Sequence, residues 1–519
     1  MAAAKSLASE SPQAETPRAA RPLLAMLALV FLGVSAFYLV MRIPIGIPGE
    51  WVTSYHTIFP DAGQMALLAF VLIAFVALAY VLDLAAARLG RSIRAAAAVV
   101  LTAAYGYVLL AVVVCGPLGR GELVVPAFAF DACGLFKNEA DKITGAGSYL
   151  GAFPDTLTAY AADYRKTVRV NNNPPGTTML FYGCNKIAAA SPALARLASR
   201  AVFGPGFAPP SVSFSATVLG AWCILIGTAL AFLPAYLITS KLAGRPSYLA
   251  TAAAMLAGSL VLFNPGNDNM QVTFFLWMVY FFLRRRQGRA ALWGLAFGAL
   301  AAGAFFFTLA TAVVVIVLFA WNAAEWYVEG RARTRRDVVF WLGAAVGLLA
   351  GFTALRAFLG YNSFAALLAC YRNHGAFYSH FPRTYWKWLI YNPWEFVLFT
   401  GGPLAAAIFW AALRKPGADE LAALPNVRLA RAALAATLLV MLVLNVSGKN
   451  SSEVNRLWVF FMPLLTIPAC VIVSAGAKRR VTILAIAVLQ ALNILILRSY
   501  VDTWRTENLM NDLQKYMGQ

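Results

Sequence analysis

The sequence predicts an all-α, polytopic transmembrane helical bundle with loops and interfacial helices at one membrane face. Of its 519 residues, 61% are hydrophobic and only 12% are charged, whereas a soluble protein carries about 25% charged residues. Apolar runs long enough to cross a bilayer, about 17–25 residues each, recur along the chain and predict about 12 to 14 spans. Because so few polar groups could not cover a water-facing surface, the chain requires lipid as its solvent.

The chain divides into a polar start, a long apolar domain and a short polar end. Residues 1–21 are rich in Ala, Ser and Pro and predict a disordered cytoplasmic tail. The apolar run that follows lacks a small-residue cleavage motif, so we expect it to be retained as the first helix of a transmembrane domain over 22–499. Residues 500–519 are expected to form an outer-face tail. The expected spans are 22–43, 64–86, 94–116, 212–240, 246–264, 269–284, 289–305, 306–323, 337–358, 394–413, 429–447, 456–475 and 481–499.

Lys and Arg collect in alternate short loops, whereas loops 44–63 and 265–268 carry none. The positive-inside rule then places the N-terminus in the cytoplasm. It also explains the net charge of +20, so we expect no nucleic-acid partner. Three segments are predicted to lie outside a plasma membrane, most simply a bacterial inner membrane. They are 117–211, 359–393 and 448–455.

The longest outer segment combines carboxylates with a proline turn. Asp131, Glu139 and Asp141 precede the sequence Asn-Asn-Asn-Pro-Pro-Gly at 171–176, and a short apolar helix is expected over 177–190. The free N–H groups of such a helix can hold an anion. A proline-started helix with an asparagine cap is the plainer explanation. Cys133 and Cys184 share this segment and could form one disulfide, but the scattered cysteines and histidines predict no zinc site.

The two shorter outer segments gather cations and aromatic residues. Glu453 and Arg456 are three residues apart, so on a helix they share a face and can pair. An ion pair that anchors the helix at the interface explains them equally well. The segment 359–393 is predicted either as an amphipathic interfacial helix or as a cationic site for a lipid-linked phosphate. Its basic residues are Arg372, His374, His380, Arg383 and Lys387.

These features together resemble the GT-C superfamily of membrane glycosyltransferases, which includes protein O-mannosyltransferases and the lipid A aminoarabinose transferase. The resemblance rests on the many spans, the carboxylate-bearing loop, the turn at Asn173–Gly176 and the Glu453-x-x-Arg456-x-Trp458 sequence. Two positions depart from the family. Asn173 stands where a His or a basic residue is common, and the carboxylate loop follows the third span instead of the first. Glu50 and Asp61 in the first outer loop are therefore the alternative carboxylates.

The resemblance implies transfer of a sugar from a polyprenyl-phosphate donor to a lipid, glycan or protein acceptor at the outer face. Asp141 or Asp131 is the expected general base, with Glu139 as the alternative. The donor phosphate is expected to bind cationic side chains, and the remaining site residues orient the groups. The phosphate ligands would be Arg372, Arg383 and Arg456; the orienting residues would be Glu453, His374 and Asn173. A divalent ion could bridge carboxylate and phosphate, but no ligand cluster in the sequence specifies one.

Two other classes of function compete with this interpretation. A multi-span transporter or lipid flippase would have Gly- or Pro-broken spans, and the sequence Pro265–Asp268 is a candidate break. A membrane scaffold would leave the outer carboxylates scattered and solvated. The sequence has no Walker loop or GxGxxG turn, so an enzyme that uses a soluble nucleotide donor is not supported.

Overall fold

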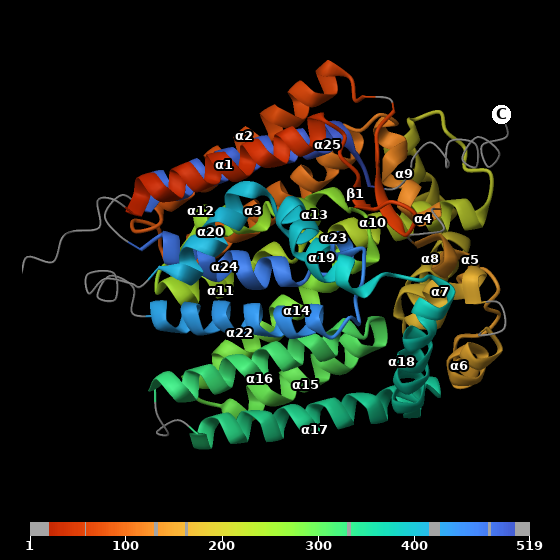
Figure 1. Cartoon of the computed structure of the whole chain (residues 1–519). Coiled ribbons are helices and arrows are strands. Elements are labelled where there is room, and N and C mark those ends of the chain that lie inside the picture. Colours follow the sequence, from red (N-terminus) through yellow and green to blue (C-terminus); the bar gives the residue numbers. More distant parts are fainter. Residues whose placement is uncertain are drawn as a thin grey trace, which may run out of the picture.

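The computed structural model describes residues 20–57, 59–128, 133–160, 164–329, 334–414, 426–475 and 479–503. It confirms an all-α polytopic bundle (Figure 1). Within the described residues, eight helical segments are long and apolar enough to cross a membrane, or up to nine if one bent pair counts as a span. The helices that form them are α2 (Ala62–Ala85), α3 (Arg91–Val114), α10 (Val212–Ala229) with α11 (Phe232–Ala243), α15 (Ala290–Phe307), α16 (Ala310–Glu329), α17 (Thr334–Leu359), α22 (Val427–Val446) and α25 (Arg479–Tyr500).

In the described part of the chain, the other expected spans do not form single helices that are both long and apolar enough to be candidate spans. The run 246–264 divides into α12 (Tyr248–Met255) and α13 (Gly258–Leu262), and almost every residue of both is buried. Irregular backbone is tolerated at membrane depth where protein surrounds it, so high hydropathy there does not require one straight helix. The remaining helices of this kind are α1 (Ala20–Val40), α14 (Asn267–Arg284), α23 (Val454–Leu457), α24 (Phe461–Val473) and the pair α19 (Tyr385–Thr400) and α20 (Gly402–Leu413), which is bent by 114°.

The pair α15 and α16 forms two separate helices, although Phe305-Phe306-Phe307-Thr308 is an unusual turn. Thr308 has an extended backbone, with φ −160° and ψ 145°. Its hydroxyl accepts a hydrogen bond from the amide of Ala310 at 3.2 Å and thereby caps the start of α16.

A buried ion network joins three helices near the arginine-rich end of the bundle. Arg285 lies in the 3₁₀ turn η4 (Arg285–Gln287) and is fully buried. It pairs with Glu325 of α16 and, at 2.8 Å, with Asp337 of α17. Arg286 reaches the same Glu325 at 2.6 Å. The charges of this loop are therefore partly used to hold α14, α16 and α17 together.

The predicted outer segments collect at the opposite end of the bundle (Figure 1, right). The expected helix at 177–190 is present as α8 (Gly176–Ala190), and it packs against α10 and α5. The other helices of this end are η1 (Gly119–Leu123), α4 (Val125–Phe128), α5 (Leu135–Ala140), α6 (Ala146–Tyr160), α7 (Tyr164–Asn172), α9 (Pro192–Phe203) and α18 (Ser363–His380).

A small antiparallel sheet, which the sequence did not predict, lies at this same end. The strands β1 (Ile45–Ile47) and β2 (Trp51–Tyr55) form a hairpin, and β3 (Val501–Asp502) pairs with β2. Gly46 has φ +129°, and a side chain there would collide with the carbonyl oxygen of Trp51 at 2.2 Å. Glycine at this position therefore lets the two strands approach closely. The hairpin turn carries Glu50.

Candidate functional site

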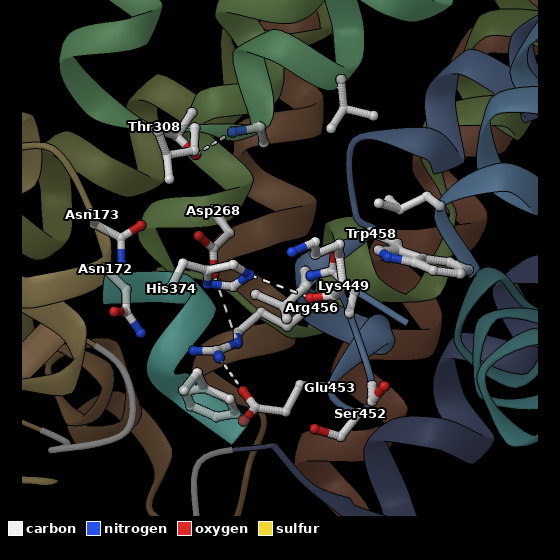
Figure 2. A pocket seen from close by; sticks show the side chains of 18 of the residues that line it. Asn172, Asn173, Asp268, Thr308, His374, Lys449, Ser452, Glu453, Arg456 and Trp458 are labelled. Carbon is white, nitrogen blue, oxygen red and sulfur yellow. Dashed lines mark hydrogen bonds and ion pairs between the residues drawn. The ribbon is translucent and has the colours of Figure 1, made fainter. Parts of the chain in front are cut away.

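A cavity of about 760 Å³ is lined in part by α7 and α18. These two helices lie at the right end of the bundle in Figure 1, and Figure 2 shows the cavity from close by. Segments that are far apart in the sequence meet around it: the hairpin turn, α7, the starts of α14 and α16, α18 and the segment 444–460. Its lining combines carboxylates with cations. The carboxylates are Glu50, Asp268 and Glu453; the cations are Arg169, Arg383, Lys449 and Arg456.

Glu50 reaches the cavity from the hairpin and is held by the start of α19. One carboxylate oxygen accepts hydrogen bonds from the Thr384 amide at 2.8 Å and the Trp388 indole at 2.7 Å, and the other accepts from the Thr384 hydroxyl at 2.6 Å. Burial of Glu50 opposes ionisation, but these hydrogen bonds together with the charge of Lys387 outweigh it and lower the pKa to about 2. Glu50 is thus a fixed anion and a poor proton acceptor.

Glu453 and Arg456 form the predicted ion pair, and both residues line the cavity. Both Ser452 and Glu453 have left-handed backbones, with φ values of 101° and 56°. Such conformations are costly for residues other than glycine and concentrate at functional sites. Arg383 donates a hydrogen bond to the Ser452 hydroxyl at 3.2 Å, so the strained turn is bound from the α18–α19 loop as well.

Asp268 lies in the first turn of α14 and faces Arg456 (Figure 2). Its Oδ2 is 3.7 Å from Arg456 Nε and, within the described residues, accepts no hydrogen bond. Its Oδ1 accepts one from the side chain of Asn267 at 3.3 Å. Burial raises the pKa of Asp268, and the nearby Arg169 opposes this only in part. A carboxylate in this environment has a higher proton affinity than a solvated one, which suits a general base.

His374 lies across the cavity from Arg456 and is joined to the loop that carries Lys449. A ring nitrogen of His374 is 3.3 Å from the carbonyl oxygen of Lys449, which also accepts a hydrogen bond from the Tyr378 hydroxyl at 2.9 Å. Burial lowers the pKa of His374, and the charge of Lys449 lowers it further. His374 is therefore neutral near pH 7 and acts as a hydrogen-bonding group there.

The cavity has an apolar side as well as a charged one. Phe275 of α14, Val313 of α16 and Leu444 of α22 line it. Val313 and Leu444 belong to α16 and α22, which pack against each other and are both candidate spans. The apolar side of the cavity is therefore formed partly by helices of the transmembrane bundle.

The structure brings most of the predicted cationic and orienting residues together. Arg383, Arg456, Glu453, His374 and Asn173 all line the cavity. Asn173 donates a hydrogen bond to the carbonyl oxygen of Arg169 at 2.9 Å and so closes the end of α7. Arg372 is exposed on α18 and lies outside the lining.

The three carboxylates predicted as the base are placed differently. Glu139 pairs with Lys142 at 3.0 Å, and Asp141 pairs with Lys137 at 2.8 Å. Asp141 also accepts hydrogen bonds from Asn185 at 3.0 Å and Ser213 at 2.9 Å. Neither belongs to the cavity lining. Asp131 lies outside the described residues.

The proline turn also differs in position from the anion site considered above. The start of α8 packs against the end of α15: a side chain at Gly176 would come within 2.6 Å of the Phe306 carbonyl oxygen. Asn172 and Asn173 line the cavity, but Gly176 does not. Packing therefore accounts for the Pro-Pro-Gly sequence.

Among the charged residues of the cavity, Arg169, Asp268 and Lys449 were not assigned a role from the sequence, and Glu50 was considered only as an alternative carboxylate. The sequence gives a reason to consider Glu50 and Asp268. Asp268 ends the Pro265–Asp268 break between two apolar runs, and Glu50 is one of two carboxylates in the first outer loop. No such reason exists for Arg169 and Lys449, because only the fold brings α7 next to the 448–455 loop.

A divalent ion does not fit the carboxylates of this cavity. Glu453 is paired with Arg456, and Glu50 is occupied by three hydrogen bonds. In the part of the chain that the structure describes, no group of three or more His, Cys, Asp or Glu residues could hold a metal. All six cysteines are free thiols, Cys133 and Cys184 included.

Comparison with protein-family models, with curated proteins and with solved structures gave no match. The resemblance to GT-C enzymes therefore rests on the residues quoted for it, and the function must be argued from the cavity.

Proposed function

We propose that the protein transfers a sugar from a polyprenyl-phosphate donor to an acceptor hydroxyl at the outer membrane face. The supporting observation is a single cavity that combines charged residues at the end of the bundle with apolar residues of α14, α16 and α22, of which α16 and α22 are candidate membrane spans. A ligand that matches both sets of residues has an anionic head and a long apolar tail. A polyprenyl phosphate has both, and its sugar would lie among the polar residues.

In the proposed reaction, the carboxylate and the cations of the cavity have different roles. The acceptor oxygen attacks the anomeric carbon of the sugar, and the bond from that carbon to the phosphate oxygen breaks. The acceptor proton passes to the carboxylate of Asp268, which contributes about 10²–10⁴-fold. The leaving polyprenyl phosphate takes the bonding electrons, and Arg383, Lys449 and Arg456 stabilise its charge.

The test is sugar transfer by purified protein in lipid, with a panel of labelled polyprenyl-phosphate sugars. Asp268→Asn keeps the size of the side chain but removes the base, so kcat should fall about 10²–10⁴-fold. Asp141→Asn is the matched control, because Asp141 lies outside the cavity, and its kcat should change by less than about threefold.

Two results would contradict the proposal. If the purified protein transferred sugar from none of the donors, the proposed reaction would be wrong. If Asp141→Asn lost sugar transfer and Asp268→Asn did not, the general base would be Asp141 in the segment 117–211, and not Asp268.

A lipid flippase or transporter is the second candidate, because the chain between α12 and α14, next to the cavity residue Asp268, is interrupted. Between α12 and α14 the chain leaves the helical conformation near residues 256–257 and 263–266, the kind of interruption found at transport sites. Movement of a labelled polyprenyl phosphate between the leaflets of vesicles, with no sugar transferred, would favour this candidate over the enzyme.

A further inference from the structure

One face of α19 contacts two segments that lie about 400 residues apart in the sequence. Thr384, Trp388 and Asn392 are spaced by four residues, so they share that face. Trp388 and Asn392 are almost fully buried, and neither lines the cavity. Their partners, in contrast, belong to the hairpin turn and to the loop that carries Glu453.

Trp388 holds the hairpin. Its indole N–H donates to Glu50 at 2.7 Å, beside the two hydrogen bonds from Thr384. These bonds keep the Glu50 carboxylate at the cavity wall, where its charge and that of Glu453 both act on Arg383.

Asn392 holds the other loop with two hydrogen bonds and makes a third to Asn445 of α22. Its amide N–H group donates to the carbonyl oxygen of Asn450 at 2.8 Å and to the side chain of Asn445 at 2.9 Å, and its oxygen accepts from the Ser452 amide at 3.4 Å. Asn445 in turn donates to the carbonyl oxygen of Leu389 at 2.9 Å. Ser452, which has a left-handed backbone, is thus itself anchored to α19 through its amide.

We infer that α19 is a positioning platform: Asn392 fixes the 450–453 turn, and Trp388 fixes the hairpin turn, so that Glu453, Arg456 and Glu50 face one cavity. Both are positioning residues, since they act through others. The consequence for catalysis rests on the proposed function, whereas the consequence for the two loops does not.

The loops are tested first, by hydrogen–deuterium exchange of purified wild type, Asn392→Leu and Trp388→Phe. Leu has nearly the shape of Asn but makes no hydrogen bond, and Phe keeps a ring without the N–H donor. Exchange in peptides that cover 448–456 should be about tenfold faster in Asn392→Leu, because the loop loses the hydrogen bonds that hold Asn450 and Ser452. Exchange in peptides that cover 45–55 should rise in Trp388→Phe.

The matched controls are another Trp and another Asn of this protein, which are hydrogen-bonded to each other. Trp341 of α17 donates to Asn322 of α16 at 3.4 Å, and neither residue lines the cavity. Asn322→Leu and Trp341→Phe should leave exchange in both loops at the wild-type rate, which separates a local effect from general loosening.

Sugar transfer is the second readout. In Asn392→Leu, kcat should fall on the order of 10²-fold, as expected for a misplaced reacting group, while the donor KM changes less than about threefold. Wild-type exchange in both loops of both platform variants would refute the platform. Failure of the wild type to transfer any sugar would instead refute the proposed function, and the exchange result would still decide the platform.

Discussion

Asp268 and Asp141 are aspartates of one chain in opposite environments. Asp141 is ion-paired with Lys137 and hydrogen-bonded by Asn185 and Ser213. Asp268 has one oxygen that accepts no hydrogen bond within the described residues, and burial raises its pKa. The burial of Asp268 therefore favours its protonated form.

This difference predicts the pH dependence of the reaction. Asp268 must be ionised to act as a base, so kcat/KM should fall as the pH falls through its raised pKa. The acid limb of the profile should therefore lie above the pH expected for a solvated aspartate. In His374→Gln the limb should stay in place, because Asp268 and not His374 is the proposed base. A limb that disappears in His374→Gln would assign it to the histidine instead.

At the residue scale, sequence spacing predicts contacts only between side chains that are a few residues apart. Glu453 and Arg456 were predicted to pair because three residues on a helix bring side chains together, and they do. The contact between Arg456 and Asp268 spans nearly 190 positions and follows from the fold alone. Arg285 lies in the turn between α14 and α15, yet it is fully buried between two carboxylates, which loop charge alone does not reveal.

At the scale of elements, α15 and α17 pack through reciprocal glycines four residues apart. A side chain at Gly298 of α15 would lie 2.0 Å from the Ala344 carbonyl oxygen, and one at Gly347 of α17 would lie 2.3 Å from that of Leu295. Small residues at this spacing let helix backbones approach closely in membranes. Gly294 and Gly343 complete the two pairs.

Gly298→Ala should therefore lower the free energy of unfolding by about 1–3 kcal/mol, as overpacking does, since the backbone cannot give way like a flexible side chain. Gly303→Ala on the same helix is the control: a side chain there meets nothing within 4 Å. It should be neutral or stabilising by up to about 1 kcal/mol. Denaturation in detergent measures both variants. Equal stabilities would show that the two helices are not packed this closely.

Hydropathy predicted where the apolar helices of the bundle lie but overestimated the number of long ones; it did not reveal the short helices of the segment 117–211 other than α8. Hydropathy reports burial in an apolar environment, whether lipid or protein provides it. The all-buried α12, α13 and α24 lie inside the bundle and are short. The hairpin at 45–55 was missed because a loop of this length has no periodicity long enough to reveal two strands that pair with a third near residue 501.

At the scale of the whole molecule, the chain separates its polar groups into two ends. The arginine-rich end uses part of its charge for the network around Arg285, and the other end holds α7, α18 and the cavity (Figure 1). The sequence predicted this polarity from loop charges. Which outer-segment residues meet in one cavity could not be predicted, since that depends on how α7, α14, α18 and the 444–460 segment pack.

The central claim is that this cavity holds a lipid-linked phosphate, and photo-crosslinking tests it most directly. A polyprenyl phosphate with a diazirine near its first isoprene unit would be irradiated with the purified protein in lipid, and the labelled peptides identified by mass spectrometry. The account predicts labelling of the start of α16 and of residues near Leu444, suppressed by unlabelled polyprenyl phosphate and weakened in Arg383→Gln. Labelling spread over the lipid-facing helices, unaffected by the competitor, would contradict it.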